Sequence, residues 1–262
     1  MKASGRHFLL TGGGNGIGRE LALLLLEKGA RVTAVDKDAA ALEQTGRLVP
    51  AHLRPNLIVR VADVSDRTAV EALCREVLEQ QGPVDGLIND AGIIQPFVRV
   101  ADLDYAHIEQ VMGVNFRGTL YFVKTLLPHL LTRPEAHIVN VSSMGGFLPV
   151  PGQTIYGASK AAIKLFTEGL HAELAETRVR VTLVLPGAVD TDITRNSGVE
   201  MPESSMPMLP ASKAASIIIG AMERDAYRVL VGKDARTMDM LYRLNPVRAA
   251  RMIRSKMREL LQ

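Results

Sequence analysis

The sequence has a single cysteine, no tryptophan and little net charge. One cysteine, Cys74, cannot form an internal disulfide, which excludes a disulfide-stapled domain and indicates a reducing compartment. Lysine and arginine total 31 against 28 aspartate and glutamate, so the overall charge shows no sign of a nucleic-acid partner. The leucine run at 23–26 is far shorter than the roughly 18 apolar residues of a spanning helix, and no signal peptide is recognisable. We therefore expect a cytoplasmic protein.

Short β-branched runs alternate with longer amphipathic stretches along the whole chain. Hydrophobic residues make up 47% and charged residues 23%, which suits a chain that folds on its own. The alternation predicts βαβ units, and so an α/β fold whose single domain is a doubly wound parallel sheet of about seven strands with helices on both faces. We expect strands at 6–11, 31–35, 57–61, 84–89, 136–142, 179–185 and 228–232, and helices at 16–28, 38–48, 66–81, 103–131, 154–176 and 211–224.

Residues 192–210 interrupt this regular pattern with three prolines, three methionines and no clear period. Long irregular loops inside compact domains often act as lids. Met201, Met206 and Met208 would offer an adaptable apolar surface over a ligand. We interpret the segment as a substrate loop, the alternative being a loop without a ligand.

A glycine-rich segment, TGGGNGIG at 11–18, lies between the first expected strand and the first expected helix. Glycines let the backbone turn tightly and let a pyrophosphate approach the helix N-terminus. Asp36 ends the next strand, where a carboxylate binds the adenosine ribose 2′-hydroxyl and repels a 2′-phosphate. The pattern predicts a dinucleotide site that prefers NAD. Lys37 leaves NADP as an alternative, and a plain glycine turn with Asp36 as a helix cap is the structural alternative.

Tyr156 and Lys160 are four residues apart at the start of an expected helix, so their side chains share a face. A free phenol has a pKa of about 10, and a base that works near neutral pH needs a lower one. A neighbouring ammonium acts in that direction. Ser143 follows an expected strand at the same sheet edge and is placed to hydrogen-bond a substrate oxygen. The six histidines are scattered, and we expect no metal site.

These motifs, with NDAG at 89–92 and Pro186-Gly187, occur in an order and spacing that resembles the short-chain dehydrogenase/reductase (SDR) family. The resemblance covers roughly residues 5–232. It implies a Rossmann-type sheet and hydride transfer between a nicotinamide cofactor and a secondary alcohol or ketone. It also implies Tyr156 as catalytic acid/base, Lys160 as the group that lowers its pKa and binds ribose, Ser143 as a guide for the substrate oxygen, and Asn115 as the holder of a water in a proton relay to Lys160.

The cofactor residues that we expect gather at one edge of the sheet, and Thr191 looks like the contact of the nicotinamide carboxamide. They are Gly12, Gly14, Asn15, Gly16, Ile17, Gly18, Asp36, Asp63, Val64, Asn89, Ala91, Gly92, Tyr156, Lys160, Pro186, Gly187, Val189 and Thr191. The family commonly has a second asparagine where this chain has Asp90, which alters the charge near the ribose. Residues expected to flank the substrate are Ile94, Gln95, Met144 and Phe147, mostly apolar, and predict an apolar or small neutral alcohol or ketone.

Residues 1–240 are expected to form the NAD(P)-binding catalytic domain, and residues 241–262 a basic amphipathic C-terminal extension. For the extension we favour packing on its own or a neighbouring subunit over contact with an anionic membrane surface or an anionic carrier. The resemblance implies a homo-oligomer, a homotetramer or dimer. Two other functions stay open: an NADP-dependent carbonyl or ketoacyl reductase and, more remotely, a non-catalytic dinucleotide-binding sensor.

Overall fold

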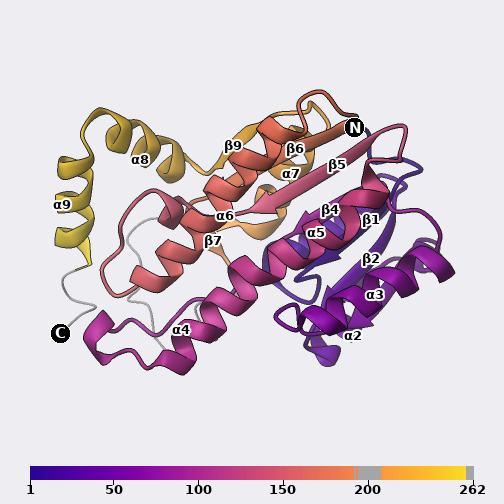
Figure 1. Ribbon diagram of the computed structural model, residues 1–262, viewed down its shortest axis with the longest axis horizontal. Coiled ribbons are helices and arrows are strands. Elements are labelled where there is room, and N and C mark those ends of the chain that lie inside the picture. The colour runs from indigo at the N-terminus through magenta and orange to yellow at the C-terminus, as the bar shows by residue number, and fades with distance from the viewer. Residues whose placement is uncertain (192, 194–207, 258–262) are drawn as a thin grey trace.

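A parallel sheet of seven strands forms the middle layer of the computed structural model, which describes residues 1–191, 193 and 208–257 (Figure 1). The strand order is β3-β2-β1-β4-β5-β6-β9, and every neighbouring pair is parallel. All carboxyl ends of the strands therefore meet at one edge. The strands are β1 His7–Thr11, β2 Arg31–Asp36, β3 Leu57–Val61, β4 Gly86–Asn89, β5 Ala136–Val141, β6 Val179–Pro186 and β9 Arg228–Val231. The predicted doubly wound sheet is confirmed.

Helices cover both faces of this sheet because each carries one apolar stripe. Leu21 and Leu25 of α1 and Ile218 of α7 pack on one face. Phe122 of α5 and Leu170 of α6, together with α3, pack on the other (Figure 1). The helices are α1 Gly16–Glu27, α2 Ala39–Leu48, α3 Arg67–Gln80, α4 Tyr105–Val111, α5 Gly118–Leu130, α6 Thr154–Glu173, α7 Ala211–Met222, α8 Lys233–Leu244 and α9 Pro246–Lys256. No helix in the described part of the chain is long and apolar enough to cross a membrane.

The helix expected at 103–131 forms as a continuous helical stretch, Tyr105–Leu130, but it is not α-helical throughout. Its first turn begins at Tyr105, where the Asp104 carboxylate accepts a hydrogen bond of 2.8 Å from the backbone N–H of His107. Between α4 and α5 the chain then widens into a π-helical turn, Met112–Arg117. Single π turns inside longer helices are frequent at functional sites, and this one carries Asn115.

The substrate loop expected at 192–210 lies largely outside the described residues, since 192 and 194–207 are not among them. Within the described part, β8 Leu209–Pro210 pairs in parallel with β7 Val189–Asp190. After β9, α8 and α9 extend away from the sheet and follow one another around a sharp corner at Asn245 (Figure 1). The start of α8 at Lys233 precedes the expected beginning of the extension.

His137 makes the stability of the fold sensitive to acid. The side chain is buried in β5, and its Nε2 lies 2.8 Å from the hydroxyl oxygen of Thr182. Burial, aided by the N-terminal ammonium and Arg180 and opposed by Asp225, lowers the pKa of His137 to about 3 from 6.5. His137 therefore binds a proton more readily in the unfolded chain than in the folded protein. Below the pKa of the unfolded chain, proton binding shifts the equilibrium toward unfolding.

We therefore predict that His137 alone raises the equilibrium constant for unfolding about tenfold for each unit by which the pH falls below the pKa of histidine in the unfolded chain. Urea unfolding at several pH values between about 5 and 7 measures the slope, in a range where few carboxylates titrate. His137→Gln keeps a side-chain amide near Thr182 and removes the titration, so its slope should be shallower. Equal slopes in the two proteins would contradict the assignment.

Candidate active site

The expected dinucleotide site lies where the strand order reverses. β1 has β2 on one side and β4 on the other, and ligands of open α/β sheets bind at such a point, beyond the carboxyl ends of the strands. Gly12 follows β1 with a φ of +77°, and a Cβ there would lie 2.9 Å from the backbone nitrogen of Ala91. A Cβ on Gly18 would overlap the carbonyl oxygen of Gly12. Only glycine fits both positions.

The N-terminus of α1 is open to an anion. Asn15, its N-cap residue, makes no side-chain hydrogen bond to the first turn, and the described first turn holds no acidic residue. Backbone N–H groups at a helix N-terminus bind phosphate well, because the helix dipole adds to their positive charge. The loop therefore fits a pyrophosphate.

Two side chains that sequence reasoning missed hold the glycine-rich loop in place. Arg19 donates from Nε to the carbonyl oxygen of Gly14 (3.0 Å) and from Nη2 to Oδ1 of Asn15 (2.9 Å). The Thr45 hydroxyl, buried in α2, donates to the carbonyl oxygen of Gly13 at 3.0 Å. The role of Arg19 could have been suspected from the sequence, because Arg19 directly follows the glycine-rich motif. Nothing in the sequence around Thr45 indicates its role.

Asp36 lies over the same loop from the end of β2. Its Oδ2 accepts a hydrogen bond of 3.0 Å from the N–H of Gly14, and its Oδ1 accepts one of 3.1 Å from the N–H of Asp38. These bonds fix the carboxylate at the expected ribose position. Lys37 is exposed, and its ammonium helps to lower the pKa of another carboxyl, Asp63.

Asp63 and Val64 follow β3 at the same edge. Burial acts to raise the pKa of Asp63, but hydrogen bonds from the Ser65 hydroxyl (2.6 Å) and backbone N–H (2.8 Å), aided by Lys37, hold that pKa below its usual value. The Ser65 bonds go to Oδ1. Val64 is buried beneath the turn.

The other expected cofactor residues reach this edge from β4 and β6. The amide of Asn89, buried in β4, donates to Asn140 Oδ1 at 2.8 Å, whereas its Oδ1 has no partner among the described residues. β6 ends at Pro186, and Gly187 donates to the carbonyl oxygen of Val231 at 2.9 Å. Val189 lies in β7. The Thr191 side chain reaches the glycine-rich loop, since a Cβ on Gly16 would be 3.1 Å from it.

Tyr156 is held at the first turn of α6 by Gln95. The buried Gln95 amide oxygen accepts hydrogen bonds from the N–H groups of Ile155 (2.9 Å) and Tyr156 (3.0 Å). Its amide nitrogen donates to the carbonyl oxygen of Gly152 at 2.9 Å. Gln95 is thus a positioning residue for the phenol, a role that its sequence context does not reveal; its contact with substrate stays a prediction.

The Tyr156 ring and the hydroxyl of Ser143, which follows β5, lie beside the same glycine: a Cβ on Gly145 would be 3.3 Å from Tyr156 Cε1 and 3.5 Å from Ser143 Oγ. Burial raises the pKa of Tyr156, the Ser143 hydroxyl opposes that rise, and the charge of Asp90 adds to it. The Lys160 ammonium lies 5.9 Å from the centre of the phenol ring. The pKa of Tyr156 is therefore raised in this structure, because burial and the charge of Asp90 outweigh the effect of Ser143. The lowering of the phenol pKa by Lys160 stays a prediction.

Lys160 is buried one turn further along α6, and its ammonium donates to the carbonyl oxygen of Val141 at 3.1 Å. Burial lowers its pKa, and the charge of Asp90 partly offsets this. A Cβ on Gly92 would lie 3.1 Å from the Lys160 ammonium, so glycine keeps the space beside it open.

Asn115 projects from the π-helical turn toward the same place. Its Oδ1 accepts from the N–H of Ile93 at 2.9 Å, and its Nδ2 donates to the carbonyl oxygen of Ile93 (3.0 Å) and to the Ser159 hydroxyl (2.9 Å). The side chain thus ties α6 to the segment after β4. Its Oδ1 would be 3.5 Å from a Cβ on Gly92, so Asn115 and Lys160 border one small space.

Asp90 brings an additional charge into this site. It is half-buried beside the first turn of α1, where its Oδ2 would be 2.9 Å from a Cβ on Gly18. Burial raises the pKa of Asp90, Lys160 and the Gly18 N–H oppose the rise, and Asp36 adds to it. The carboxylate is therefore coupled to both the expected base and the expected cofactor position.

We predict that Asp90→Asn lowers the pKa of the Tyr156 phenol, because it removes a negative charge that favours the protonated form. The acid limb of the kcat/KM profile for alcohol oxidation should then move to lower pH. Initial rates across the pH range measure this, with Asp102→Asn on the exposed turn before α4 as a matched charge control. An unmoved acid limb would contradict the coupling.

The expected substrate residues surround the same end of the sheet. Ile94 follows β4 and is half-buried, and Met144 begins the short 3-10 turn Met144–Gly146 after Ser143. Phe147 is half-buried and packs on Tyr242 of α8 with 6.0 Å between ring centres. In the described residues, no group of three or more His, Cys, Asp or Glu side chains is placed to hold a metal ion.

Comparison with known proteins gives consistent matches. The family model for short chain dehydrogenase matches residues 6–202. The oxidoreductase SadH of Mycobacterium tuberculosis is 35% identical over 252 residues, which cover 92% of this chain and 91% of that protein. A short chain dehydrogenase/reductase from Burkholderia phymatum, solved with NAD, superposes with a TM-score of 0.82 at 27% identity and covers 93% and 96% of the two chains. A short chain dehydrogenase from Burkholderia cenocepacia, solved with NADP, has a TM-score of 0.78 at 28% identity, with both chains covered completely.

Proposed function

Because the chain belongs to the short-chain dehydrogenase family of oxidoreductases, we propose that it transfers a hydride between NAD and a secondary alcohol or ketone, with Tyr156 as acid/base. One observation carries this proposal: the Tyr156 ring and the Ser143 hydroxyl both border Gly145, one helical turn from the buried Lys160 ammonium, at the sheet edge that bears the glycine-rich loop. A sensor that only binds a dinucleotide has no use for this group of side chains.

The proposed cofactor fits the residues present. The open loop at 12–18 and the uncapped start of α1 suit a pyrophosphate. The fixed carboxylate of Asp36 suits a free ribose 2′-hydroxyl and thus NAD. The neighbours solved with NAD and with NADP support a nicotinamide cofactor and leave the NADP-dependent carbonyl or ketoacyl reductase as the second candidate.

In the proposed mechanism, the chain's own residues hold the substrate oxygen and move its proton. Ser143 and Tyr156 bind that oxygen, and Tyr156 donates a proton to it during ketone reduction or removes one during alcohol oxidation. The Lys160 ammonium favours the phenolate that remains after donation. Nicotinamide, when bound, supplies or accepts the hydride at the carbon.

The raised pKa of Tyr156 suits the direction of reduction at neutral pH. A phenol whose pKa is raised keeps its proton, so it is ready to donate to a ketone oxygen as that oxygen gains charge. Oxidation requires the phenolate and is therefore favoured at alkaline pH. The mostly apolar surroundings, Ile94, Met144 and Phe147, support an apolar or small neutral substrate.

Absorbance at 340 nm, followed with NADH or NADPH and ketones of graded size, tests the proposal. We expect ketone-dependent loss of NADH absorbance, and the reverse change with NAD and the matching alcohols. Cofactor binding without turnover across the whole series would favour the non-catalytic sensor.

The proposed homo-oligomer, a tetramer or dimer formed through α5 and α6, is supported by Leu165, which is 70% exposed on α6.

A further inference from the structure

The corner formed by α8 and α9 has one face packed on the molecule and one face without a partner among the described residues. Ala235 of α8, together with Ala249 and Ile253 of α9, is buried. Ala249 and Ile253 pack on Leu148, which follows the catalytic 3-10 turn. The inner faces of both helices are therefore packed on the molecule. The outer faces carry exposed cationic and apolar side chains.

Positive charge dominates this pair of helices. Residues 233–255 contain six lysines and arginines against two aspartates. Neither aspartate is free, because Asp234 accepts a hydrogen bond of 2.6 Å from the N–H of Ala188, and Asp239 is buried in an ion pair with Arg228 at 2.7 Å. The outer face therefore has no carboxylate of its own to offset its cations.

The arginines of α9 lie on its exposed face. Arg248, Arg251 and Arg254 recur at a spacing of three, and all three are exposed. Within residues 1–191, 193 and 208–257, none of them forms an ion pair. A row of exposed cations along one helix face matches a surface of dense negative charge.

Large apolar side chains are exposed at the corner between the helices. Leu244 is 79% exposed, Met240 61% and Val247 58%. Met240 and Leu244 are one turn apart on α8, and Val247 lies in the first turn of α9, the helix that bears the three arginines. Exposed apolar groups bordered by cations are typical of helices that lie at a membrane interface.

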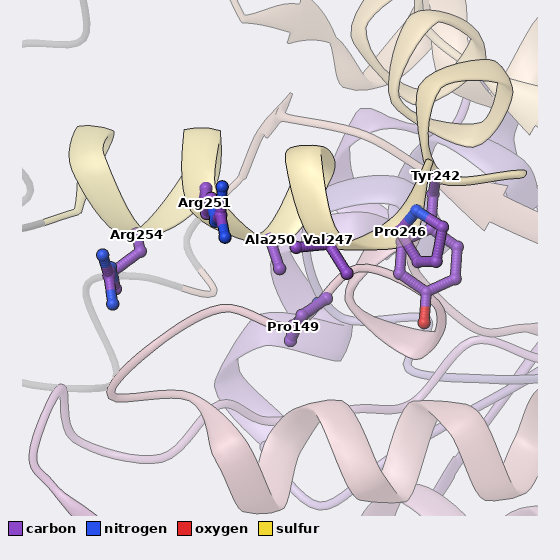
Figure 2. Close-up of a pocket in the computed structure, with 7 residues that line it drawn as sticks. All are labelled: Pro149, Tyr242, Pro246, Val247, Ala250, Arg251 and Arg254. Carbon is purple, nitrogen blue, oxygen red and sulfur yellow. The ribbon is translucent and has the colours of Figure 1, made fainter. Parts of the chain in front are cut away.

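A groove runs beneath α9 and shares these residues (Figure 2). It has a volume of about 360 Å³ and is lined on its apolar part by Pro149, Tyr242, Pro246, Val247 and Ala250, with Arg251 and Arg254 at one end. In Figure 2 the side chains of Val247 and Arg254 extend from α9 toward the side of Pro149, and Arg251 lies in front of the helix. Apolar walls that end in two cations suit an acyl chain below an anionic headgroup.

We propose that the outer α8–α9 face, defined by Met240, Leu244, Val247, Arg248, Arg251 and Arg254, docks on an anionic lipid surface. The corner side chains enter the headgroup layer while the arginines bind lipid phosphates. Contact with lipid, rather than with a second copy of the chain, follows from the charge: a copy would bring the same cations to the interface. The expected packing of the extension on its own subunit thus applies to its inner face. For its outer face, we propose contact with an anionic membrane surface instead.

Sedimentation with vesicles tests this docking independently of enzyme activity. The 262-residue chain should pellet with vesicles of equal parts phosphatidylglycerol and phosphatidylcholine, and stay in solution with phosphatidylcholine alone. High salt should release it, because the attraction is screened. Protein that stays in solution with the anionic vesicles, or pellets equally with both, would overturn the proposal.

Two double variants separate the contributions. Arg251→Gln with Arg254→Gln should weaken partitioning roughly 25-fold, at about fivefold for each cation. Leu244→Ser with Val247→Ser should weaken it by about tenfold or more. Arg67→Gln and Leu48→Ser, exposed on α3 and α2, are the matched controls and should bind like the natural chain.

Sedimentation velocity without lipid tests the alternative that a second copy of the chain covers the outer α8–α9 face. Natural chain and Leu244→Ser/Val247→Ser variant should show the same oligomeric state, with circular dichroism confirming that the variant folds. A variant that falls to a smaller species, or double variants that bind vesicles as tightly as the natural chain, would overturn lipid docking. The first result would assign the face to an interface between copies.

Discussion

Replacing Tyr156 with phenylalanine is expected to lower kcat by about 10³-fold, within the range typical of lost general acid–base catalysis. The variant keeps the ring that lies beside Gly145 at the start of α6 and loses only the hydroxyl. Because the glycine-rich loop and Asp36 are untouched, the Kd for NADH should change by less than about threefold. Steady-state rates at 340 nm and NADH fluorescence titration measure the two quantities.

Tyr105→Phe is the matched control. Tyr105 is 85% exposed on α4, and this substitution also removes one phenol hydroxyl, but from the surface. It should leave kcat and Kd unchanged. A Tyr156→Phe variant that retained full turnover would show that another group moves the proton. Equal losses in turnover and NADH binding would instead assign Tyr156 a structural role.

Replacing Asp36 with alanine is expected to change the ratio of kcat/KM for NAD over NADP by about 10³-fold in favour of NADP. The carboxylate offers charged hydrogen bonds to a ribose diol, which are worth about 1.5–3 kcal/mol. It also repels a 2′-phosphate, and such like-charge contacts cost several kcal/mol. Both effects disappear with the carboxylate, and the neighbouring Lys37 ammonium would then attract the phosphate without opposition from Asp36.

Initial rates with each cofactor at several concentrations give this ratio. Asp38→Asn is the control because Asp38 carries a charge two residues away and caps α2 through a hydrogen bond of 3.1 Å from Ala41 N–H, which asparagine can also accept. Its ratio should change by far less. If Asp36→Ala keeps the NAD preference of the natural chain, the ribose assignment is contradicted.

The sheet could be predicted from the sequence because its central strands β1, β4 and β5 are buried throughout and are rich in apolar residues. β5 is buried throughout, and its observed bounds, Ala136–Val141, lie within one residue of those expected. The glycine-rich loop was equally visible, since its glycines are required by close contacts such as that of Gly18 with Gly12. In both cases local sequence and local structure agree.

Other features depend on contacts between distant segments and left no local signal. The π-helical turn at Met112–Arg117 presents Asn115 to Ile93, 22 residues earlier in the chain. Gln95 supports the turn at Tyr156 across 61 residues. The direction of the Tyr156 pKa also escaped prediction, because burial and the charge of Asp90 depend on how the segments assemble.

A crystal structure of the ternary complex with NAD and a secondary alcohol identified in the 340 nm screen tests the central claim most directly. The account predicts that the Tyr156 phenol oxygen and the Ser143 hydroxyl both lie about 2.6–3.2 Å from the alcohol oxygen, with the reacting carbon facing the nicotinamide. An alcohol oxygen held by other groups, out of reach of Tyr156, would contradict it.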